Sequence, residues 1–185
     1  MKKYQVIYAD PPWKYDFACK KKTAIEDKYP TMTQGELVSL AVPASGDSVL
    51  YLWATAPKLL EAIDVMRAWG FTYVTHAIWD KGYSGMGYWF LGQHELLLVG
   101  KRGKFSPPLP KNRIASIFTV QKSRHSEKPF IVRHWLNKWF PDCAKLEMFA
   151  RPIGGLFQKE EGWDVWGNEV DSDIELINSE KKTKG

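Results

Sequence analysis

The sequence predicts an α/β fold in which helices cover both faces of a mostly parallel sheet. Apolar runs rich in β-branched and aromatic residues alternate along the chain with segments of helical periodicity. With 185 residues, 44% of them hydrophobic, the chain can build one complete core, and no internal repeat or linker divides it. Because alternating strands and helices pack as a sheet between helical layers, we expect one domain over residues 1–170 and a polar, frayed tail over residues 171–185.

Six apolar segments have the length and composition of buried strands. The first ends at Asp10, because Pro11 and Pro12 cannot donate backbone hydrogen bonds to a ladder. Residues 80–92 contain four glycines and are expected to form a mobile loop between the third and fourth segments. The expected strands are residues 4–9, 48–54, 71–79, 94–99, 113–119 and 145–150.

Two segments carry clear helix signals at their ends. Residues 33–41 begin with Thr33 and have Glu36 three positions later, which is the spacing of a capping box. Residues 56–69 have Pro57 in the first turn, where proline is favoured, and a run of apolar residues at helical spacing. Both segments are therefore expected to be helices.

A third helix is expected to begin with Ser126 as its cap and to end near Phe140. Pro129 would lie in its first turn, where a backbone N–H is not needed. Such a helix would also place Lys128 in its first turn, beside free backbone N–H groups that favour an anion. Its apolar stripe is expected to consist of Ile131, Trp135 and Trp139.

The composition excludes several classes of protein. The two cysteines, Cys19 and Cys143, lie far apart and cannot supply a disulfide scaffold or a four-cysteine zinc site. The four histidines lack the spacing of metal ligands, so we expect no metal. The first apolar run is too short for a signal peptide and no run reaches 18 apolar residues, so a cytoplasmic protein without membrane contact is expected.

Positive charge is concentrated in part of the chain, although the net charge is only +5. Residues 101–145 hold eleven lysines and arginines against two acidic residues, whereas residues 146–178 hold eight acidic residues against two basic ones. A further basic cluster, Lys20-Lys21-Lys22, lies in an expected loop. A solvated surface is the simpler explanation of any one run, but segregation into blocks favours a positive face. Together with 14% aromatic residues, this face indicates nucleic-acid binding.

The segment Asp10-Pro11-Pro12-Trp13 lies where the first strand ends, and ligands of open α/β sheets bind at such ends. Asp10 offers carboxylate oxygens, the prolines hold the backbone carbonyls stiffly, and Trp13 offers a flat stacking face. These groups suit the exocyclic amine of a flat base such as adenine, because acceptors on both N–H bonds can aim the nitrogen lone pair at an electrophile. The simpler alternative is a turn that ends the strand, with Trp13 packed into the core.

This tetrapeptide is the first of a series of segments that together are much more specific than it is alone. The others, in order, are Tyr29–Met32 (YPTM), Leu52–Thr55 (LWAT), Ala68–Phe71 (AWGF), Gly85–Trp89 (GMGYW), His94-Glu95, Arg124–Pro129 (RHSEKP), Leu146–Arg151 (LEMFAR), Gly162-Trp163 and Trp166–Glu169 (WGNE). In its content and order the series resembles the MT-A70 family of S-adenosylmethionine-dependent N6-adenine methyltransferases, over roughly residues 4–170.

The resemblance implies a Rossmann-like methyltransferase fold in permuted order, with the catalytic tetrapeptide first and the cofactor segment last. It assigns Asp10 and the Pro11 carbonyl to the target amine and Trp13 to the base pocket, with Pro12 completing the catalytic tetrapeptide. The cofactor that it implies is S-adenosylmethionine, and Lys128 matches the lysine that meets the methionine carboxylate. The residues that it implies for cofactor binding are Asp10, Lys128, Arg151, Asn168 and Glu169. For Lys128 and Glu169, the alternatives are a solvated lysine and one more surface acid.

Binding of the substrate is expected to involve the basic clusters and the glycine-rich loop. That loop is either a lid whose aromatic residues stack against a base or a loop pinned by aromatic anchors. Glu95 resembles a family position that could orient the loop or the substrate, and an ion pair or a cap is an equally good interpretation. The residues expected to bind the substrate or nucleic acid are Lys20, Lys21, Lys22, Tyr88, Trp89, Glu95, Lys101, Arg102 and Lys104.

We therefore expect methylation of the adenine N6 amine in nucleic acid, DNA rather than RNA, by a compact enzyme of bacterial or phage type. Two alternatives stay open: a non-catalytic nucleic-acid-binding subunit of a methyltransferase pair, and a methyltransferase that acts on a small adenine-like molecule. The sequence departs from the family at Pro152-Ile153-Gly154, where many members have polar residues, so part of the cofactor contact stays open. The choice between a monomer and a homodimer also stays open.

Overall fold

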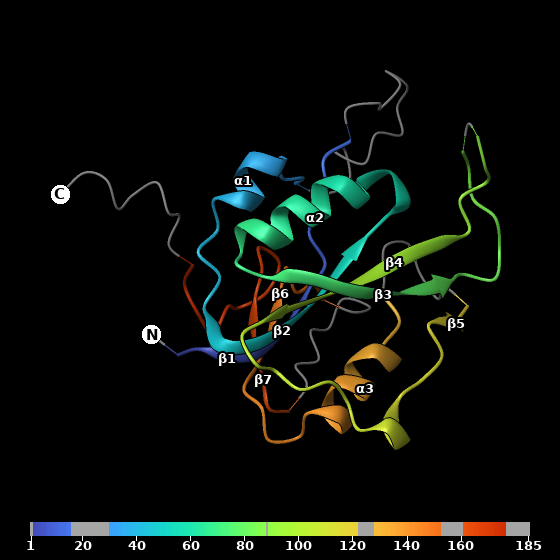
Figure 1. Cartoon of the computed structure of the whole chain (residues 1–185). Coiled ribbons are helices and arrows are strands. Elements are labelled where there is room, and N and C mark those ends of the chain that lie inside the picture. Colours follow the sequence, from blue (N-terminus) through green and yellow to red (C-terminus); the bar gives the residue numbers. More distant parts are fainter. Residues whose placement is uncertain (1, 16–29, 88, 122–127, 153–160, 177–185) are drawn as a thin grey trace.

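The computed structural model describes residues 2–15, 30–87, 89–121, 128–152 and 161–176. A seven-stranded sheet in the order β5-β3-β4-β2-β1-β6-β7 forms its centre (Figure 1). β4 is antiparallel to both of its neighbours, and every other pair of strands is parallel. The strands are β1 (Tyr4–Ala9), β2 (Ala44–Ala54), β3 (Thr72–Asp80), β4 (His94–Arg102), β5 (Ile117–Thr119), β6 (Lys145–Met148) and β7 (Trp163–Trp166). The predicted α/β class with a mostly parallel sheet is confirmed.

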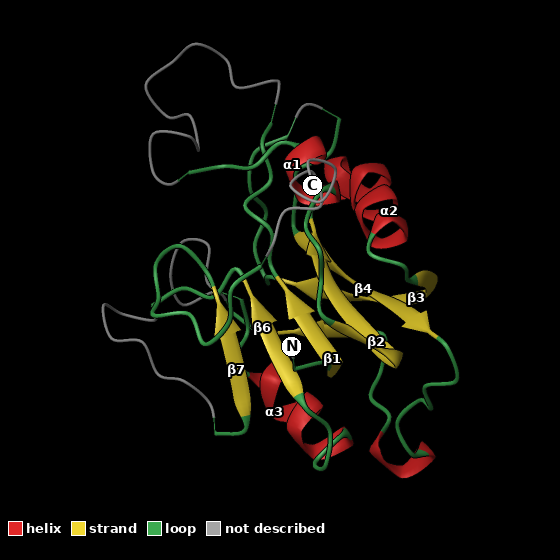
Figure 2. Cartoon of the chain, turned by 90° about the vertical axis from the view of Figure 1, so that its left-hand side faces the viewer, coloured by secondary structure: helices red, strands yellow, loops and turns green. Residues whose placement is uncertain are grey.

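Helices cover both faces of this sheet, as predicted (Figure 2). α1 (Gln34–Val38) and α2 (Leu59–Ala68) pack on one face, and α3 (Ile131–Trp139) packs on the other. The short 3-10 helix η2 (Ala56–Lys58) leads into α2, and a second one, η3 (Pro110–Asn112), lies in the connection between β4 and β5. No helix in the described ranges is long and apolar enough to cross a membrane.

The capping box predicted for α1 is present in full. Thr33 Oγ1 accepts a hydrogen bond from the backbone N–H of Glu36 at 3.3 Å, and Glu36 Oε2 accepts one from the backbone N–H of Thr33 at 2.7 Å. Two donors that the first turn would leave unpaired are thereby satisfied. The start of this helix follows from local sequence alone.

The start predicted for α3 is wrong. Its first residue is Ile131, with Phe130 as the cap, so Lys128 and Pro129 lie in the irregular segment before the helix. Pro129 disfavours helical geometry in the residue before it, and its carbonyl accepts from Val132 N–H in the turn that starts the helix. Lys128 is therefore no part of a helix N-terminus, and the anion site expected there is not formed. Ser126 lies outside the described residues.

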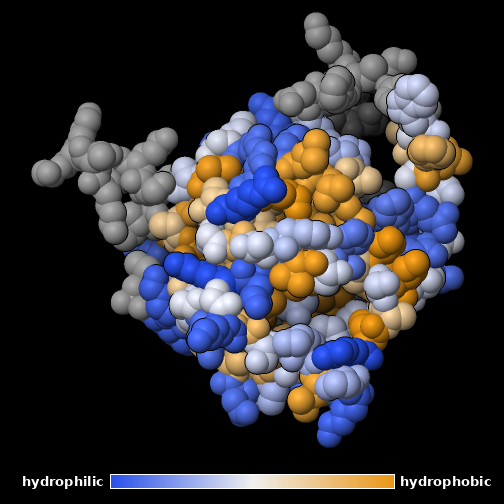
Figure 3. All heavy atoms as spheres, in the orientation of Figure 1, coloured by the Kyte–Doolittle hydropathy of each residue, from blue (hydrophilic) through white to orange (hydrophobic). Residues whose placement is uncertain are grey.

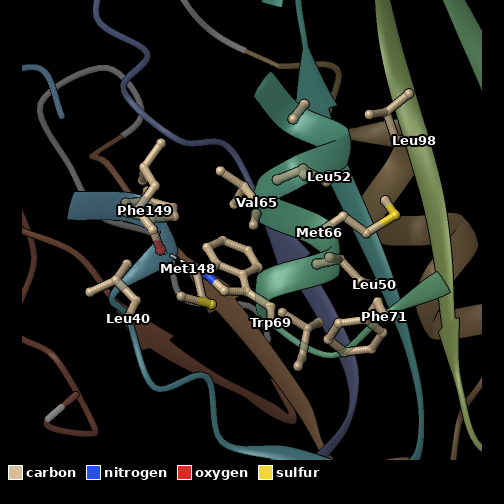
Figure 4. Close-up of a cluster of buried hydrophobic side chains, with 14 of the residues drawn as sticks. Leu40, Leu50, Leu52, Val65, Met66, Trp69, Phe71, Leu98, Met148 and Phe149 are labelled. Carbon is tan, nitrogen blue, oxygen red and sulfur yellow. Dashed lines mark hydrogen bonds between the residues drawn. The ribbon is translucent and has the colours of Figure 1, made fainter. Parts of the chain in front are cut away.

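The core beneath α1 and α2 fixes these helices over the central strands (Figure 4). Leu50 and Leu98, from β2 and β4, and Met66, from α2, are fully buried in it. Trp69 follows α2 and donates its indole N–H to the carbonyl of Leu37 in α1, at 2.8 Å. Gly100 lies under Met66, and a Cβ there would come within 2.7 Å of the Met66 sulfur. The Met66 side chain thus packs directly on the backbone of Gly100 and would have to shift for a larger residue.

The face beneath α3 is built mainly from aromatic residues. Val132 and Leu136 are buried, whereas Trp135 and Trp139 are partly buried beside them, with ring centroids 6.1 Å apart. The predicted stripe of Ile131, Trp135 and Trp139 does pack against the core, and Val132 and Leu136 beside it are the residues that are fully covered.

The C-terminal part of the sheet was not predicted in full. β6 ends at Met148, and β7 adds an edge strand where only a cofactor segment was expected. Asp173 donates its backbone N–H to Val165 O, and its carboxylate accepts from Val165 N–H. Ile174 and Leu176 pack against the core, so the fraying expected from Asp171 is not seen up to residue 176. This return of the chain satisfies the backbone of Val165 on the outer edge of β7, where an edge strand would otherwise leave these groups unpaired.

Candidate active site

The ends of four strands are aligned at one edge of the sheet. Ala9 of β1 pairs with Leu52 of β2 and with Met148 of β6, and Met148 pairs with Trp166 of β7. After β1 the chain continues to β2 on one side, and it later returns to β6 on the other side. The carboxyl ends of strands at such a switch in strand order are where open α/β sheets bind ligands. Asp10 is the residue that follows β1 at this point.

The turn after β1 is held rigidly by backbone hydrogen bonds. Asp10 N–H donates to Met148 O at 3.4 Å, which ties the turn to β6. Trp13 N–H donates to Pro11 O at 2.9 Å, and Met32 N–H donates to Pro12 O at 2.8 Å. The two prolines restrict the backbone further. Asp10 is thus presented from a scaffold with little freedom to move.

Trp13 does not offer the stacking face that the sequence predicted. Its side chain is 6% exposed, lies in the core, and donates its indole N–H to Trp53 O at 3.1 Å. Pro11 and Pro12 are buried as well, whereas the Asp10 side chain is 20% exposed. The simpler alternative, a tryptophan packed into the core, describes Trp13 correctly. Asp10 is the accessible group of the tetrapeptide.

Asp10 belongs to a chain of four alternating charges. Lys128 Nζ lies 2.9 Å from Asp10 Oδ1 and 3.2 Å from Glu95 Oε2, and Lys81 Nζ lies 2.8 Å from Glu95 Oε1. The side chains of all four residues are 20% exposed or less. Two cations and two anions leave the cluster neutral, and each lysine is paired, as buried charges require.

Electrostatics keep the middle of this cluster ionised. Burial raises the pKa of the Glu95 carboxyl, but the ammonium groups of Lys128 and Lys81 outweigh it and hold that pKa below its usual range. Burial lowers the pKa of Lys128, but the carboxylates of Asp10 and Glu95 outweigh it and raise that pKa above its usual value. Lys128 is therefore a permanent cation beside Asp10 at neutral pH.

Two tryptophans form the aromatic wall against which both lysines pack. Lys128 Nζ lies 5.7 Å from the ring centroid of Trp53, and Lys81 Nζ lies at the same distance from that of Trp79. The two rings meet edge to face at 5.8 Å, and Trp53 donates its N–H to the hydroxyl of Tyr8 at 2.7 Å. Cations over indole faces are attracted electrostatically, so this wall helps to fix both ammonium groups.

Three of the residues predicted to hold the cofactor, Arg151, Asn168 and Glu169, follow β6 and β7 along the same edge as Asp10. Arg151 Nε is 3.9 Å from Glu169 Oε1, and Asn168 and Glu169 are exposed in the turn after β7. A Cβ atom on Gly167 would lie 2.8 Å from the backbone nitrogen of Ala150, and closer still to its carbonyl oxygen. A glycine is thus required where these two turns meet.

Three of the predicted basic residues lie elsewhere. Lys101, Arg102 and Lys104 are at or just beyond the end of β4, and Arg102 pairs with Ser48 near the start of β2. Six residues separate Glu95 from Lys101 along an antiparallel strand, or about 20 Å. The three residues lie at this distance because β4 runs against its neighbours and carries its end away from Asp10, and their expected part in nucleic-acid binding stays a prediction. Lys20, Lys21, Lys22 and Tyr88 lie outside the described residues.

Trp89 lies on a projecting arm formed by residues 82–87 and 89–92 (Figure 1). The arm begins beside the active site, because Asp80 and His94 at its base pair with each other and Glu95 follows. Met86, Trp89 and Phe90 are 97%, 94% and 89% exposed. Orange hydrophobic side chains lie along the arm in Figure 3. Large apolar groups exposed together in this way mark an interaction site.

Sequence reasoning missed Lys81 and the wall of Trp53 and Trp79. The register of the β3–β4 hairpin contains the signal, because Trp79 pairs with Glu95, and Lys81 N–H donates to Gln93 O. A residue two positions after Trp79 lies on the same side of the strand, close to Glu95. Knowing that the two strands pair directly is enough to bring the lysine and the glutamate together.

No group of three or more His, Cys, Asp and Glu suited to a metal occurs among the residues the structure describes.

An open, mostly parallel α/β sheet that presents a polar turn at the switch in strand order has the general plan of a Rossmann-like fold. The profile of the MT-A70 family matches residues 4–169. The chain therefore belongs to the MT-A70 family and is a methyltransferase. The match covers every strand and helix described above. The return of the chain beside β7 lies beyond it.

Named relatives agree with this assignment. The type II methyltransferase M.MunI of Mycoplasma sp is 37% identical over 95% of this chain and 82% of its own length. An N(6)-adenosine-methyltransferase MT-A70-like protein of Drosophila melanogaster is 28% identical over 98% of this chain, and the N(6)-adenosine-methyltransferase catalytic subunit METTL3 of Homo sapiens is 26% identical over 95% of it. The chain spans only 29% and 30% of the lengths of these last two proteins.

Proposed function

We propose that this chain transfers a methyl group from S-adenosylmethionine to the exocyclic N6 amine of adenine in nucleic acid. The position of Asp10 supports this most directly. One of its oxygens binds Lys128, and the other has no partner among the described residues. It therefore presents a free acceptor at the switch point of the sheet, on a turn that cannot relax away from a ligand.

An aromatic amine needs such an acceptor because its lone pair is delocalised into the ring. Asp10 Oδ2 can accept one amine N–H, and the second lone pair of the Pro11 carbonyl can accept the other, since the first binds Trp13 N–H. Two acceptors on the N–H bonds turn the nitrogen lone pair out of the ring plane and aim it. Preorganised groups of this kind typically contribute about 10²–10³ in rate.

Lys128 and Glu95 serve this reaction by holding Asp10 in place. Lys128 binds Asp10 through one carboxylate oxygen, and Glu95 holds Lys128 from the opposite side. Because Lys81 occupies the other oxygen of Glu95, the carboxylate of Glu95 cannot turn away. The Asp10 side chain is thus oriented by the ion-paired side chains of Lys128, Glu95 and Lys81 as well as by its own backbone.

The described residues fit a zwitterionic, ribose-bearing methyl donor. Bound S-adenosylmethionine would supply an electrophilic methyl group on a sulfonium. Lys128 and Asp10 offer one cation and one anion for its amino-acid end, and Arg151, Asn168 and Glu169 lie at neighbouring strand ends on the same edge. Asn168 and Glu169 are exposed side chains that can hydrogen bond to ribose hydroxyls.

We propose that the projecting arm contacts the polymer. Its base is joined to Glu95 by the hairpin, and its exposed rings are the stacking surface that Trp13 does not provide. A base inside a duplex cannot reach a strand-end acceptor unless it is flipped or already single-stranded, and stacking on exposed rings stabilises such a base. Lys14, exposed and four residues from Asp10, is placed to meet a phosphate nearby.

We propose DNA rather than RNA as the polymer. The similarity to the relative named as a type II methyltransferase is higher, and covers far more of that protein, than the similarity to the relatives named as N(6)-adenosine methyltransferases. The basic composition suits either polymer, with a net charge of +5.

The proposal is tested by incubating the protein with S-adenosylmethionine and a mixture of DNA and RNA, followed by mass spectrometry of the digested nucleosides. We expect N6-methyl-deoxyadenosine, in amounts that fall to background with Asp10→Ala. In a parallel incubation with free adenosine and no polymer, formation of methylated adenosine, together with no methylated polymer in the first reaction, would identify a small-molecule enzyme instead. Donor binding without any methylated product from either polymer would point to a non-catalytic subunit.

A further inference from the structure

A cavity of about 460 Å³ lies on the α3 face of the sheet. Its floor is formed by β2, β3 and β4, and its walls are α3 and the connection that runs through η3. The floor uses Val49 and Tyr51 of β2 and residues 74–77 of β3, which precede the carboxyl ends of these strands. Asp10 lies beyond those carboxyl ends, so the cavity is separate from the active site.

The walls of the cavity are apolar and largely aromatic. Trp135, Trp139 and Phe140 line it from the helix side, and Phe105 lines it from the connection. Phe105 and Phe140 meet edge to face at 5.2 Å, and Trp135 and Trp139 are stacked, so the rings are held by one another. Ligand pockets in proteins are typically apolar hollows of about 300–1,000 Å³ with a few polar groups that set orientation. The cavity has that size and character.

The charged groups that line the cavity are all basic. Lys101 and Arg113 contribute to the lining, together with the ring of His76, and no aspartate or glutamate does. Neither Lys101 nor Arg113 has a carboxylate partner within the part of the chain that the structure describes. Arg113 Nε donates to Pro108 O at 3.1 Å, which steadies its guanidinium beside the cavity. Both side chains belong to exposed residues and therefore lie at the opening.

We propose that this cavity binds a small amphipathic organic anion, with a flat aromatic body among the rings and a carboxylate or sulfonate between Lys101 and Arg113. An apolar body releases water from aromatic walls that would otherwise stay hydrated. An anionic head group meets two cations that lack another carboxylate partner, so the charges of ligand and cavity are complementary. A neutral or cationic ligand of the same shape would lack the electrostatic attraction to Lys101 and Arg113.

The proposal is tested with 8-anilinonaphthalene-1-sulfonate as the anionic probe and N-phenyl-1-naphthylamine as its neutral counterpart. Fluorescence titration of the full chain is compared among wild type and the variants Lys101→Gln, Arg113→Gln and Ala115→Trp. Ala115 lines the cavity but is exposed, so the larger side chain can enter the cavity without disturbing the core. Lys104→Gln is the matched control, because Lys104 is exposed, lies close to Lys101 in the sequence and does not line the cavity.

We expect one saturable site for the sulfonate probe. Lys101→Gln and Arg113→Gln should each weaken its binding up to about fivefold, the effect of an exposed ion pair, and leave the neutral probe unchanged. Ala115→Trp should abolish binding of both probes, and Lys104→Gln should change neither. Binding of S-adenosylmethionine, measured by calorimetry in each variant, should stay at the wild-type value and show that the fold is intact.

Four results would overturn the proposal. Displacement of the sulfonate probe by S-adenosylhomocysteine would place it in the active site, and loss of its binding in Trp89→Ser/Phe90→Ser would place it on the arm. A dimer in sedimentation measurements that Ala115→Trp converts to a monomer would show that a second copy of the chain covers the cavity. Equal weakening of both probes by Lys101→Gln would show that the positive charge of Lys101 plays no part in ligand binding.

Discussion

Lys128 and Asp10, which are far apart in the sequence, form an ion pair of 2.9 Å at the end of β1. The resemblance to the MT-A70 family assigned one of them to the cofactor and the other to the target amine. Because the two residues are in direct contact, a change in either one should affect both donor binding and the positioning of the target amine. Glu95 extends the pair and holds Lys128 from its far side.

Asp10→Ala should reduce the rate of methyl transfer by about 10²–10³, because it removes the one accessible carboxylate acceptor of the turn. Asp10→Asn should fall between this variant and the wild type, since an amide oxygen still accepts a hydrogen bond but carries no charge. Single-turnover rates with radiolabelled donor measure the effect. Asp64→Asn, on the exposed surface of α2, is the control and should be unaffected. An Asp10→Ala enzyme with more than half of the wild-type rate would show that the active site is elsewhere.

Lys128→Ala and Asn168→Ala should each weaken binding of S-adenosylmethionine. Loss of a charge-assisted hydrogen bond costs about 1.5–3 kcal/mol, which corresponds to roughly a 10- to 100-fold change in dissociation constant. Calorimetric titration measures it, with Lys138→Ala on the exposed side of α3 as the matched lysine control. Unchanged dissociation constants in both variants would mean that the donor does not bind at the ends of β1, β6 and β7.

Glu95→Gln should lower the free energy of unfolding by about 3 kcal/mol at neutral pH, because it leaves two buried lysines with one carboxylate fewer. The folded pKa of Glu95 lies below its unfolded value of about 4.3, so its contribution is complete above that pH and is lost as the pH falls further. The raised pKa of Lys128 affects stability only at alkaline pH, so it does not disturb the acid range.

The measurement for Glu95 is urea unfolding of wild type and Glu95→Gln between neutral pH and about pH 3, the range in which carboxylates titrate. The difference between the two proteins should be constant down to about pH 4.3 and should then shrink. A difference that does not depend on pH would show that Glu95 acts through packing and not through its charge.

Replacing Lys101, Arg102 and Lys104 together by alanine should not change the KM for a short oligonucleotide. Six nucleotides of one strand span about 20 Å, so an oligonucleotide of about that length bound at Asp10 barely reaches these residues. Lys14→Ala should raise the KM and reduce the slope of log affinity against log salt by about 0.7 to 0.9, the loss of one phosphate contact. A higher KM in the triple variant alone would place the polymer along β4 instead.

Trp89→Ala and Phe90→Ala should weaken polymer binding without changing donor affinity, since stacking of one base on an aromatic ring contributes about 1–3 kcal/mol. Fluorescence anisotropy with labelled single-stranded DNA and RNA measures the effect. Leu60→Ala is the control, because Leu60 is a hydrophobic residue that is 79% exposed on α2, away from the arm. Equal effects of all three substitutions would indicate that the arm has no special part in binding.

Much of the fold follows from signals that act over a few residues. The apolar run before Asp10, the prolines that end it and the capping box of Thr33 and Glu36 each depend on neighbours along the chain, and each is found where it was expected. The series of segments typical of the MT-A70 family placed Asp10, Lys128 and Arg151 in one site before any contact was known. The structure brings the three to one edge of the sheet.

Other features depend on contacts between distant parts of the chain. Whether Trp13 stacks on a base or packs in the core is decided by β2, whose Trp53 carbonyl accepts its N–H. Lys101 lies far from Asp10 because β4 runs antiparallel to its neighbours, a direction that its own composition does not reveal. Lys81 joins the active site only because the hairpin register sets it beside Glu95. Local sequence marks some element ends, such as the prolines after β1 and the capping box of α1, whereas strand order and direction, which arise from packing across the whole sheet, determine which side chains meet.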